Sequence, residues 1–308
     1  MLDLRVAGYS RKVARSELGS LGIDFLFVGA NPAEDRSSAV RIAGATPATV
    51  ELSLRDDSIE AAGVLLASLY ETSELDHMIE SYRGRLAIDI TSLEHKVWAP
   101  LVATCLRLDR ELVAFYAEPD DYVKSPEPLP GAIFDLSEAI RGIEPLPGFA
   151  RVAPPGDEDG WFAPLLGFEG ARLAHVMDQE EVDNRRTYPV IGFPGFRLEY
   201  PTYTYLGNRE VLGTGHIHRR VEYASASNPF EAFHALERIL SRTNGARLRV
   251  APIGTKPHAL GAVLFAIAHP AVVELIYDHP VRSRGRTHGV RLMHLYEVSD
   301  FFRGRHPT

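Results

Sequence analysis

The sequence has 308 residues, of which 45% are hydrophobic and 24% charged, and its formal net charge is −8 at pH 7. This composition is typical of a globular protein with about two domains. Surfaces that bind nucleic acid are usually basic, so the acidic balance does not indicate nucleic acid as the main partner. The single cysteine, Cys105, excludes an internal disulfide and a cysteine-rich zinc site, and its apolar surroundings predict a core residue.

No apolar stretch approaches the roughly 20 residues that a membrane-spanning helix needs. The N-terminal segment also lacks the apolar core of a secretory signal. We therefore expect a cytoplasmic protein with no membrane partner.

In the first half, short apolar runs alternate with longer amphipathic segments, which predicts strands joined by helices. The expected strands cover residues 23–30, 49–54, 86–91 and 111–117. The expected helices cover residues 58–70 and 93–108, with Asp57 placed to cap the first of them.

Residues 126–160 are rich in proline and end in acidic residues, which predicts a connector with one short helix near residues 135–140. The expected domains are therefore residues 1–125 and 161–308. In the second half we expect strands at 189–195, 220–224, 248–253 and 271–277, and a terminal strand at 290–298 at an antiparallel edge. Helices are expected at 229–242, after the N-cap Asn228, and at 256–268.

The two halves share short sequence matches in the same order. The segment 50–52 with 60–61 matches 221–223 with 231–232, an offset of 171 residues, and Lys96 and Ala99 match Lys256 and Ala259 at an offset of 160 residues. We therefore predict an α/β fold of two tandem Rossmann-like units with mostly parallel sheets, related by internal duplication. The alternative is that any alternation of strands and helices produces such matches.

Ligands of open parallel sheets bind beyond the carboxyl ends of the strands. The most informative such end is Gly254-Thr255-Lys256, which follows a predicted strand and opens a predicted helix. A glycine permits close backbone approach, helix-start amides attract an anion, and the threonine hydroxyl and lysine add a donor and a charge. The segment, with His258 beside it, therefore predicts a phosphate or anion site. A plain turn with a solvated lysine is the alternative.

Gly261, one turn into the same helix, is expected to let the helix pack closely on the sheet. The first-half counterpart of the anion site is Thr91, Ser92 and Lys96, which keeps the hydroxyls and the lysine but lacks the glycine. It predicts a weaker site.

A strand followed by Gly254-Thr255-Lys256-Pro257 resembles the second ligand motif of CRISPR-associated Rossmann-fold (CARF) sensor domains and of the related SAVED domains, which fuse two such units. In those families the segment contacts the phosphates of cyclic oligonucleotides. The resemblance implies ligand contacts from this segment and, in the first half, from Thr91, Ser92 and Lys96. It places the family's first motif at Gly29–Asn31 and at 192–195.

The resemblance also implies a nucleotide or cyclic oligonucleotide as ligand and a role in prokaryotic defence. Ile253 stands where the family has another glycine, and no effector domain is attached. The output would therefore come from a partner effector protein or from a homo-oligomer.

Other candidate residues have competing explanations. Ser225 and Asn228 could bind a ligand or cap a helix, and Arg282 belongs to a basic cluster that could clamp phosphate or lie solvated in a loop. Asp56 and Asp57 could form an acid–base pair or a helix cap.

Two further groups stand out by residue type. His216 and His218 have no carboxylate nearby in the sequence and make a poor metal site, so no metal is expected. The aromatic segment from Phe193 to Tyr205 could stack a base, dock a partner or cover the sheet.

No catalytic motif is recognisable, so the first hypothesis is a binding module for an anionic small molecule, a nucleotide or phosphate ligand. The second is an enzyme acting on nucleotides or phosphorylated metabolites, with Asp56, Asp57 or His258 as acid–base groups. The third is a non-catalytic subunit that docks through the aromatic segment and the proline-rich connector.

Overall fold

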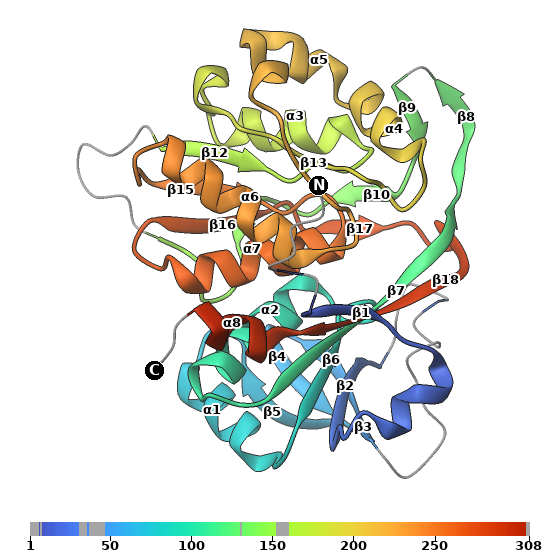
Figure 1. The fold of residues 1–308 in the computed structure, drawn as a ribbon, viewed down its shortest axis with the longest axis vertical. Helices are drawn as coiled ribbons and strands as arrows, with labels where there is room; N and C mark the ends of the chain where they lie inside the picture. The colour runs from blue at the N-terminus through green and yellow to red at the C-terminus, as the bar shows by residue number, and fades with distance from the viewer. Residues whose placement is uncertain are drawn as a thin grey trace. The chain divides into compact units, whose positions relative to one another are not determined.

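The computed structural model describes residues 8–30, 47–129, 131–151 and 160–305, together with Val6 and Arg36. The chain divides into two compact units, Met1–Asp121 with Thr287–Thr308, and Tyr122–Arg286 (Figure 1). The expected division at residues 1–125, 126–160 and 161–308 differs from this one at the C-terminus. The residues after 286 pack with the first unit because their strand lies inside its sheet.

The first unit is built on an eight-stranded sheet with the order β1-β18-β7-β6-β2-β3-β4-β5. Its strands are β1 (Ser10–Lys12), β2 (Phe25–Gly29), β3 (Ala48–Arg55), β4 (Ser58–Ala61), β5 (Val64–Ser68), β6 (Leu86–Asp89), β7 (Leu112–Tyr122) and β18 (Thr287–Glu297). The central strands β3, β2, β6 and β7 are parallel, whereas β1, β4 and β5 pair antiparallel with their neighbours. The chain runs from β2 outward to β3 and returns to β6 on the other side of β2. The strand order therefore reverses between β2 and β6.

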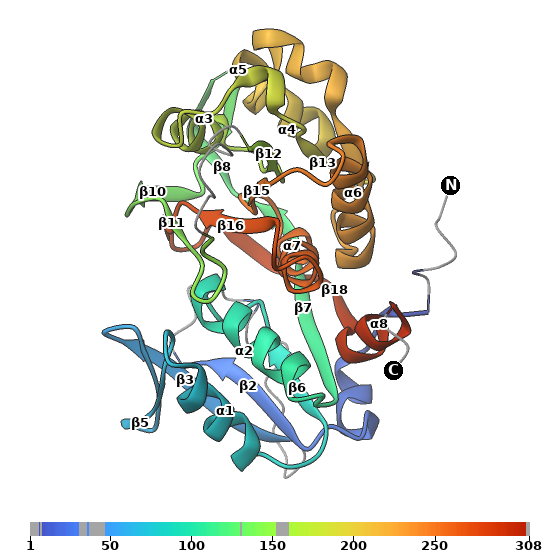
Figure 2. The ribbon, with the colours of Figure 1, turned by 90° about the vertical axis from the view of Figure 1, so that its left-hand side faces the viewer.

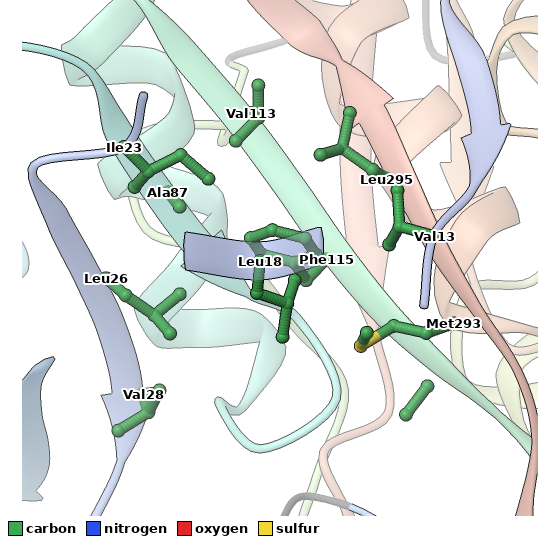
Figure 3. Close-up of a cluster of buried hydrophobic side chains, with 11 residues drawn as sticks. Val13, Leu18, Ile23, Leu26, Val28, Ala87, Val113, Phe115, Met293 and Leu295 are labelled. Carbon is green, nitrogen blue, oxygen red and sulfur yellow. The ribbon is translucent and has the colours of Figure 1, made fainter. Parts of the chain in front are cut away.

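Alternating side chains of these strands bury the two faces of the sheet. On one face, strand residues pack against Val13 and against Leu18 of the 3₁₀ helix η1 (Arg15–Ser20), as Figure 3 shows. The strand residues of this cluster are Leu26, Val28, Ala87, Val113, Phe115, Ala117, Met293 and Leu295. Helices α1 (Thr72–Ser81) and α2 (His95–Arg107) pack against each other, and Trp98 of α2 is fully buried.

The helix expected at 58–70 is wrong, because this segment forms the hairpin β4–β5. Asp56 and Asp57 have φ angles of 44° and 60° and turn the chain from β3 into β4. Ala62 and Gly63 have φ angles of 50° and 78° and join β4 to β5. Two-residue turns with positive φ match the twist of a hairpin, so Asp57 is a turn residue and not a helix cap.

The second unit contains five parallel strands in the order β14-β13-β12-β15-β16. Parallel ladders join β12, β15 and β16, isolated parallel bridges join the β12 region to the β13 region, and β13 pairs with β14. The strands are β12 (Trp161–Pro164), β13 (Val190–Gly192), β14 (Glu222–Ala224), β15 (Leu248–Ala251) and β16 (Val273–Tyr277), and β11 (Glu144–Pro145) pairs antiparallel with β16. Counted along the chain, the spatial order is third, second, first, fourth, fifth. The order therefore reverses between β12 and β15.

Helices lie on both faces of these strands. On one face, side chains of α3 (Gly170–Gln179), α5 (Arg209–Gly213) and η4 (Thr214–Arg220) pack on strand residues such as Phe162 and Ile191. The short helices η3 (Asn184–Arg186) and α4 (Tyr200–Gly207) precede α5 in the chain. Helices α6 (Pro229–Arg242) and α7 (Lys256–Ala268) lie side by side (Figure 2).

Gly261 does not serve the packing of α7 on the sheet that its sequence position predicts. A Cβ atom added there would lie 2.2 Å from the carbonyl oxygen of Pro229 and 2.9 Å from Cβ of Ala232, both in α6. The glycine therefore permits the close approach of two helices.

The predicted connector forms further strands. They are β8 (Lys124–Leu129), β9 (Ala132–Phe134), β10 (Ser137–Ile140) and β11, and β10 pairs with β17 (Pro280–Arg282). The short helix expected near 135–140 is therefore wrong. The terminal strand expected at 290–298 exists as β18, but β1 covers its outer side and helix α8 (Val298–Arg305) follows it. None of the helices in the described ranges has the length and apolar composition that crossing a bilayer requires.

Candidate ligand-binding site

In the second unit, the loops that follow β12 and β15 meet at the point where the strand order reverses. A Cβ atom added to Gly254 would lie 2.6 Å from the carbonyl oxygen of Leu166 and 2.9 Å from that of Leu165. One added to Gly167 would lie 3.0 Å from the carbonyl oxygen of Ile253. Glycine is therefore required on both loops, and the predicted residue Gly254 lies at the position where open parallel sheets bind ligands.

Thr255 begins α7 as its N-cap. Its Oγ1 accepts a hydrogen bond from the His258 amide at 3.3 Å and donates one to the carbonyl oxygen of Ala226 at 2.8 Å. The hydroxyl proton therefore joins α7 to the loop after β14. Lys256, the first residue of the helix, is only 5% exposed, which is unlike the solvated lysine of a plain strand-to-helix turn.

His258 lies in the first turn of α7 and is fully buried. Its Nε2 is 3.0 Å from the carbonyl oxygen of Ser225, so Nε2 carries a proton and donates it. Burial lowers the pKa of the imidazole to about 4, although hydrogen bonds to the Ser225 and Ala224 carbonyls act in the opposite direction. The ring is therefore neutral at neutral pH. Its Nδ1 has no hydrogen-bond partner among the residues that the structure describes.

The loop after β14 is held mainly by capping contacts. Oδ1 of Asn228 accepts hydrogen bonds from the amides of Phe230 at 3.0 Å and Glu231 at 3.3 Å, so the capping alternative for Asn228 is confirmed. The Ser225 amide donates to Oε2 of Glu231 at 2.9 Å. The Ala226 amide donates to the carbonyl oxygen of Pro194 at 3.0 Å, which connects this loop to the one after β13. Loops from three neighbouring strands therefore form one connected edge.

Arg172, a residue of α3 that sequence reasoning missed, joins two further loops of this edge. Its Nε and Nη2 donate to the two carboxylate oxygens of the fully buried Asp278, both at 2.6 Å. Its Nη1 donates to the carbonyl oxygen of Ile253 at 3.0 Å, directly before Gly254. Burial alone would lower the pKa of Arg172, but the hydrogen bonds and charge of Asp278 raise it above its usual value. The ion pair thereby fixes the loop that carries Gly254.

The aromatic segment divides into buried and exposed parts. Tyr200 and Tyr203 belong to a ring cluster that also contains Tyr122, Phe134 and Phe168, so they cover the interior. Phe193 and Tyr223 remain 59% and 46% exposed, with ring centroids 6.0 Å apart. These two rings follow or belong to the strands β13 and β14, beside the connected edge.

In the first unit, the predicted residues meet at the corresponding reversal of the strand order. The Gly29 amide donates to Oγ of Ser92 at 2.8 Å, and a Cβ atom added to Gly29 would lie 2.7 Å from the Ser92 carbonyl oxygen. Oγ1 of the buried Thr91 accepts a hydrogen bond from the Ala117 amide at 2.8 Å. Both hydroxyls therefore hold strand ends together. Lys96 forms an ion pair with Asp57 at 3.6 Å, and Asn31 lies outside the described residues.

Arg282 lies in β17, which pairs with β10 in a two-stranded sheet separate from the parallel strands. The rings of His216 and His218 are 6.0 Å apart. Within the described ranges, no group of three or more His, Cys, Asp or Glu residues is arranged to hold a metal ion. Asp56 and Asp57 lie in a hairpin turn of the first unit and His258 in the second, so no shared contact supports them as one acid–base set.

A buried polar cluster in the first unit was also missed as a set. Glu118 of β7 and His294 of the neighbouring β18 form a hydrogen bond of 2.7 Å, and Nη1 of Arg291 lies 3.7 Å from the other Glu118 oxygen. Arg36 donates to the Tyr116 hydroxyl at 3.3 Å and to the Ala117 carbonyl oxygen at 3.0 Å. Glu118 follows the strand that ends near it, which is a visible signal, but nothing in the sequence pairs it with His294.

Comparison with known proteins identifies no relative. No family model matches the sequence, and no curated protein matches it. The function must therefore be inferred from the geometry.

Proposed function

We propose that the chain is a binding module of two tandem Rossmann-like units, which recognises a nucleotide or a related phosphate ligand at the Gly254–His258 segment. The observation that carries this proposal is the contact of the Gly254 and Gly167 loops at the reversal of the strand order. Ligands of open α/β sheets bind in the crevice at such a reversal.

The strand orders support the assignment to this architecture. In the second unit, the order third, second, first, fourth, fifth is that of the first five strands of dinucleotide-binding folds. In the first unit, β3-β2-β6-β7 follows the same plan around β2, with the hairpin β4–β5 added beside β3.

Internal duplication rests on one of the two sequence matches. At the offset of 160 residues, Lys96 and Lys256 both lie in the first turn of the helix that follows the strand beyond the reversal. At the offset of 171 residues, the match pairs β3, adjacent to β2, with β14, which is separated from β12 by β13. The segments that follow are the strand β4 and the helix α6. Only the first match supports duplication.

The chemistry of the α7 N-terminus favours an anion. The positive end of the helix dipole and the first-turn amides attract negative charge, and Lys256 adds a full positive charge. Pro257 contributes no amide and Thr255 already caps His258, so the amides before Pro257 are the relevant donors. In the CARF and SAVED domains that this segment resembles, the ligand is a messenger nucleotide and another protein segment supplies the output. We propose the same division of labour here, in the cytoplasm and with a partner effector.

The proposal is tested by calorimetry of the purified chain against a panel of nucleotides and inorganic phosphate. The wild-type chain should bind at least one of them. Lys256→Met should weaken that binding by about 10- to 100-fold, the usual worth of a charge-assisted hydrogen bond.

Lys12→Met, which removes an exposed lysine from β1, is the matched control and should leave the affinity unchanged. Thermal unfolding of each variant checks that the fold is retained. The proposal is wrong if the wild-type chain binds nothing in the panel, or if folded Lys256→Met binds as tightly as wild type.

A further inference from the structure

The His258 side chain has two nitrogen atoms with different surroundings. Nε2 donates to the Ser225 carbonyl oxygen at 3.0 Å and so anchors the first turn of α7 to the loop after β14. Nδ1 is buried and, within the described part of the chain, meets no hydrogen-bond partner. Buried polar groups in native proteins nearly always have a partner, so this atom is a candidate for contact with a ligand.

The chemistry of Nδ1 follows from the proton on Nε2. A neutral imidazole has one donor and one acceptor nitrogen, and the carbonyl partner makes Nε2 the donor. Full burial opposes a second proton on the ring. Nδ1 is therefore an acceptor, and it cannot bind a phosphate oxygen, which is also an acceptor. It requires a hydroxyl or N–H donor.

The position of His258 narrows the choice of donor. The residue lies three positions after Thr255, in the helical turn where the first amides and Lys256 favour an anion. A group that meets Nδ1 must therefore be a donor close to a phosphate. A hydroxyl on the sugar of a ribose phosphate has this chemistry.

Building on the ligand site proposed above, we propose that His258 is a specificity-determining residue whose Nδ1 accepts a hydrogen bond from a ribose hydroxyl. The site would then take ribonucleotides in preference to their deoxy forms. Sites that hydrogen-bond a substrate hydroxyl reject analogues without it, because the buried partner is left unpaired.

The test compares the four ribonucleoside 5′-monophosphates with their 2′-deoxy and 3′-deoxy forms by calorimetry on the full chain. The wild-type chain should bind at least one ribonucleotide about tenfold more tightly than one of its two deoxy forms, as expected for one hydrogen bond with a buried partner. Equal affinities for all three forms refute the role of His258 while leaving the proposed function intact. Binding of none of these compounds refutes both.

Two variants separate the two ring nitrogens. His258→Gln keeps a donor near the position of Nε2, toward Ser225, but removes the acceptor at Nδ1, so the preference should disappear. His258→Asn keeps an acceptor near the position of Nδ1 and should retain the preference. A preference that survives in His258→Gln overturns the inference. The comparison of ligands on the wild-type chain decides the question even where a variant does not fold.

Discussion

Replacing Gly261 by alanine tests whether α6 and α7 are packed as closely as the structure indicates. The added Cβ would lie 2.2 Å from the Pro229 carbonyl oxygen, 2.9 Å from Cβ of Ala232 and 3.1 Å from the Phe233 amide nitrogen. Two of these atoms are backbone and cannot rotate away. Glycine-to-alanine changes inside helices otherwise stabilise by about 0.5–1 kcal/mol, whereas overpacking costs about 1–3 kcal/mol. We therefore expect Gly261→Ala to lower the free energy of unfolding by about 1–2 kcal/mol.

Urea unfolding followed by circular dichroism measures this difference. Gly213→Ala, at the end of α5, is the matched control, because a Cβ added there meets nothing within 4 Å. It should be neutral or slightly stabilising. If Gly261→Ala is as stable as wild type, the helices are not in backbone contact and the reasoning is refuted.

Three further predictions follow from buried polar groups. Because the pKa of His258 falls to about 4 in the folded chain, from about 6.5 when unfolded, its contribution of roughly 3 kcal/mol is complete above that upper value. It is lost as the pH falls toward 4, so the stability of His258→Gln should fall less than that of wild type between neutral pH and the lower value; parallel curves would contradict this. His294→Leu leaves the Glu118 carboxylate buried without its 2.7 Å partner and should destabilise by about 3 kcal/mol in urea unfolding. The double variant with Glu118→Leu should recover part of that loss, and strictly additive losses would argue against the pair. Burial raises the pKa of the Cys105 thiol to about 12, so a thiol reagent at about pH 8 should react only with the unfolded chain, and rapid labelling of the native chain would count against this burial.

Local patterns predicted the parallel strands and the helices that follow them. The expected strands at 23–30, 49–54, 86–91 and 111–117 are confirmed as β2, β3, β6 and β7, and the expected helices at 93–108, 229–242 and 256–268 as α2, α6 and α7. Long apolar runs with clear caps, such as Asn228 before α6, depend mainly on neighbouring residues. This is why they could be found without the fold.

The errors arise where tertiary contacts decide. The segment 58–70 has apolar residues that also fit a helix, and the positive φ angles of Asp56 and Gly63 select the hairpin. Strand β12 has only four residues, Trp161–Pro164, and no strand was expected there. Missing it removed the first strand of the second unit, and with it the reversal of strand order beside Gly254.

The site was predicted in part for the same reason. Gly254, Thr255, Lys256 and His258 are consecutive or nearly so, and a strand-to-helix junction is visible in sequence. Arg172 and Asp278 are 106 positions apart, and Glu118 and His294 are 176 apart, so their pairing depends on topology alone. The role of Thr255 as a cap that donates to Ala226 likewise required the position of a loop from another strand.

The position of β18 has a consequence for biosynthesis. The chain leaves the first unit after Asp121 and re-enters it at Thr287, and β18 lies between β1 and β7. During translation, every residue of the second unit is therefore made before the first sheet can close. Strand β1, made almost first, must wait for one of the last segments to reach its partner. The Val123 amide donates to the Arg286 carbonyl oxygen at 2.9 Å, so the second unit begins and ends at one point and can be completed as an inserted module while the first is unfinished.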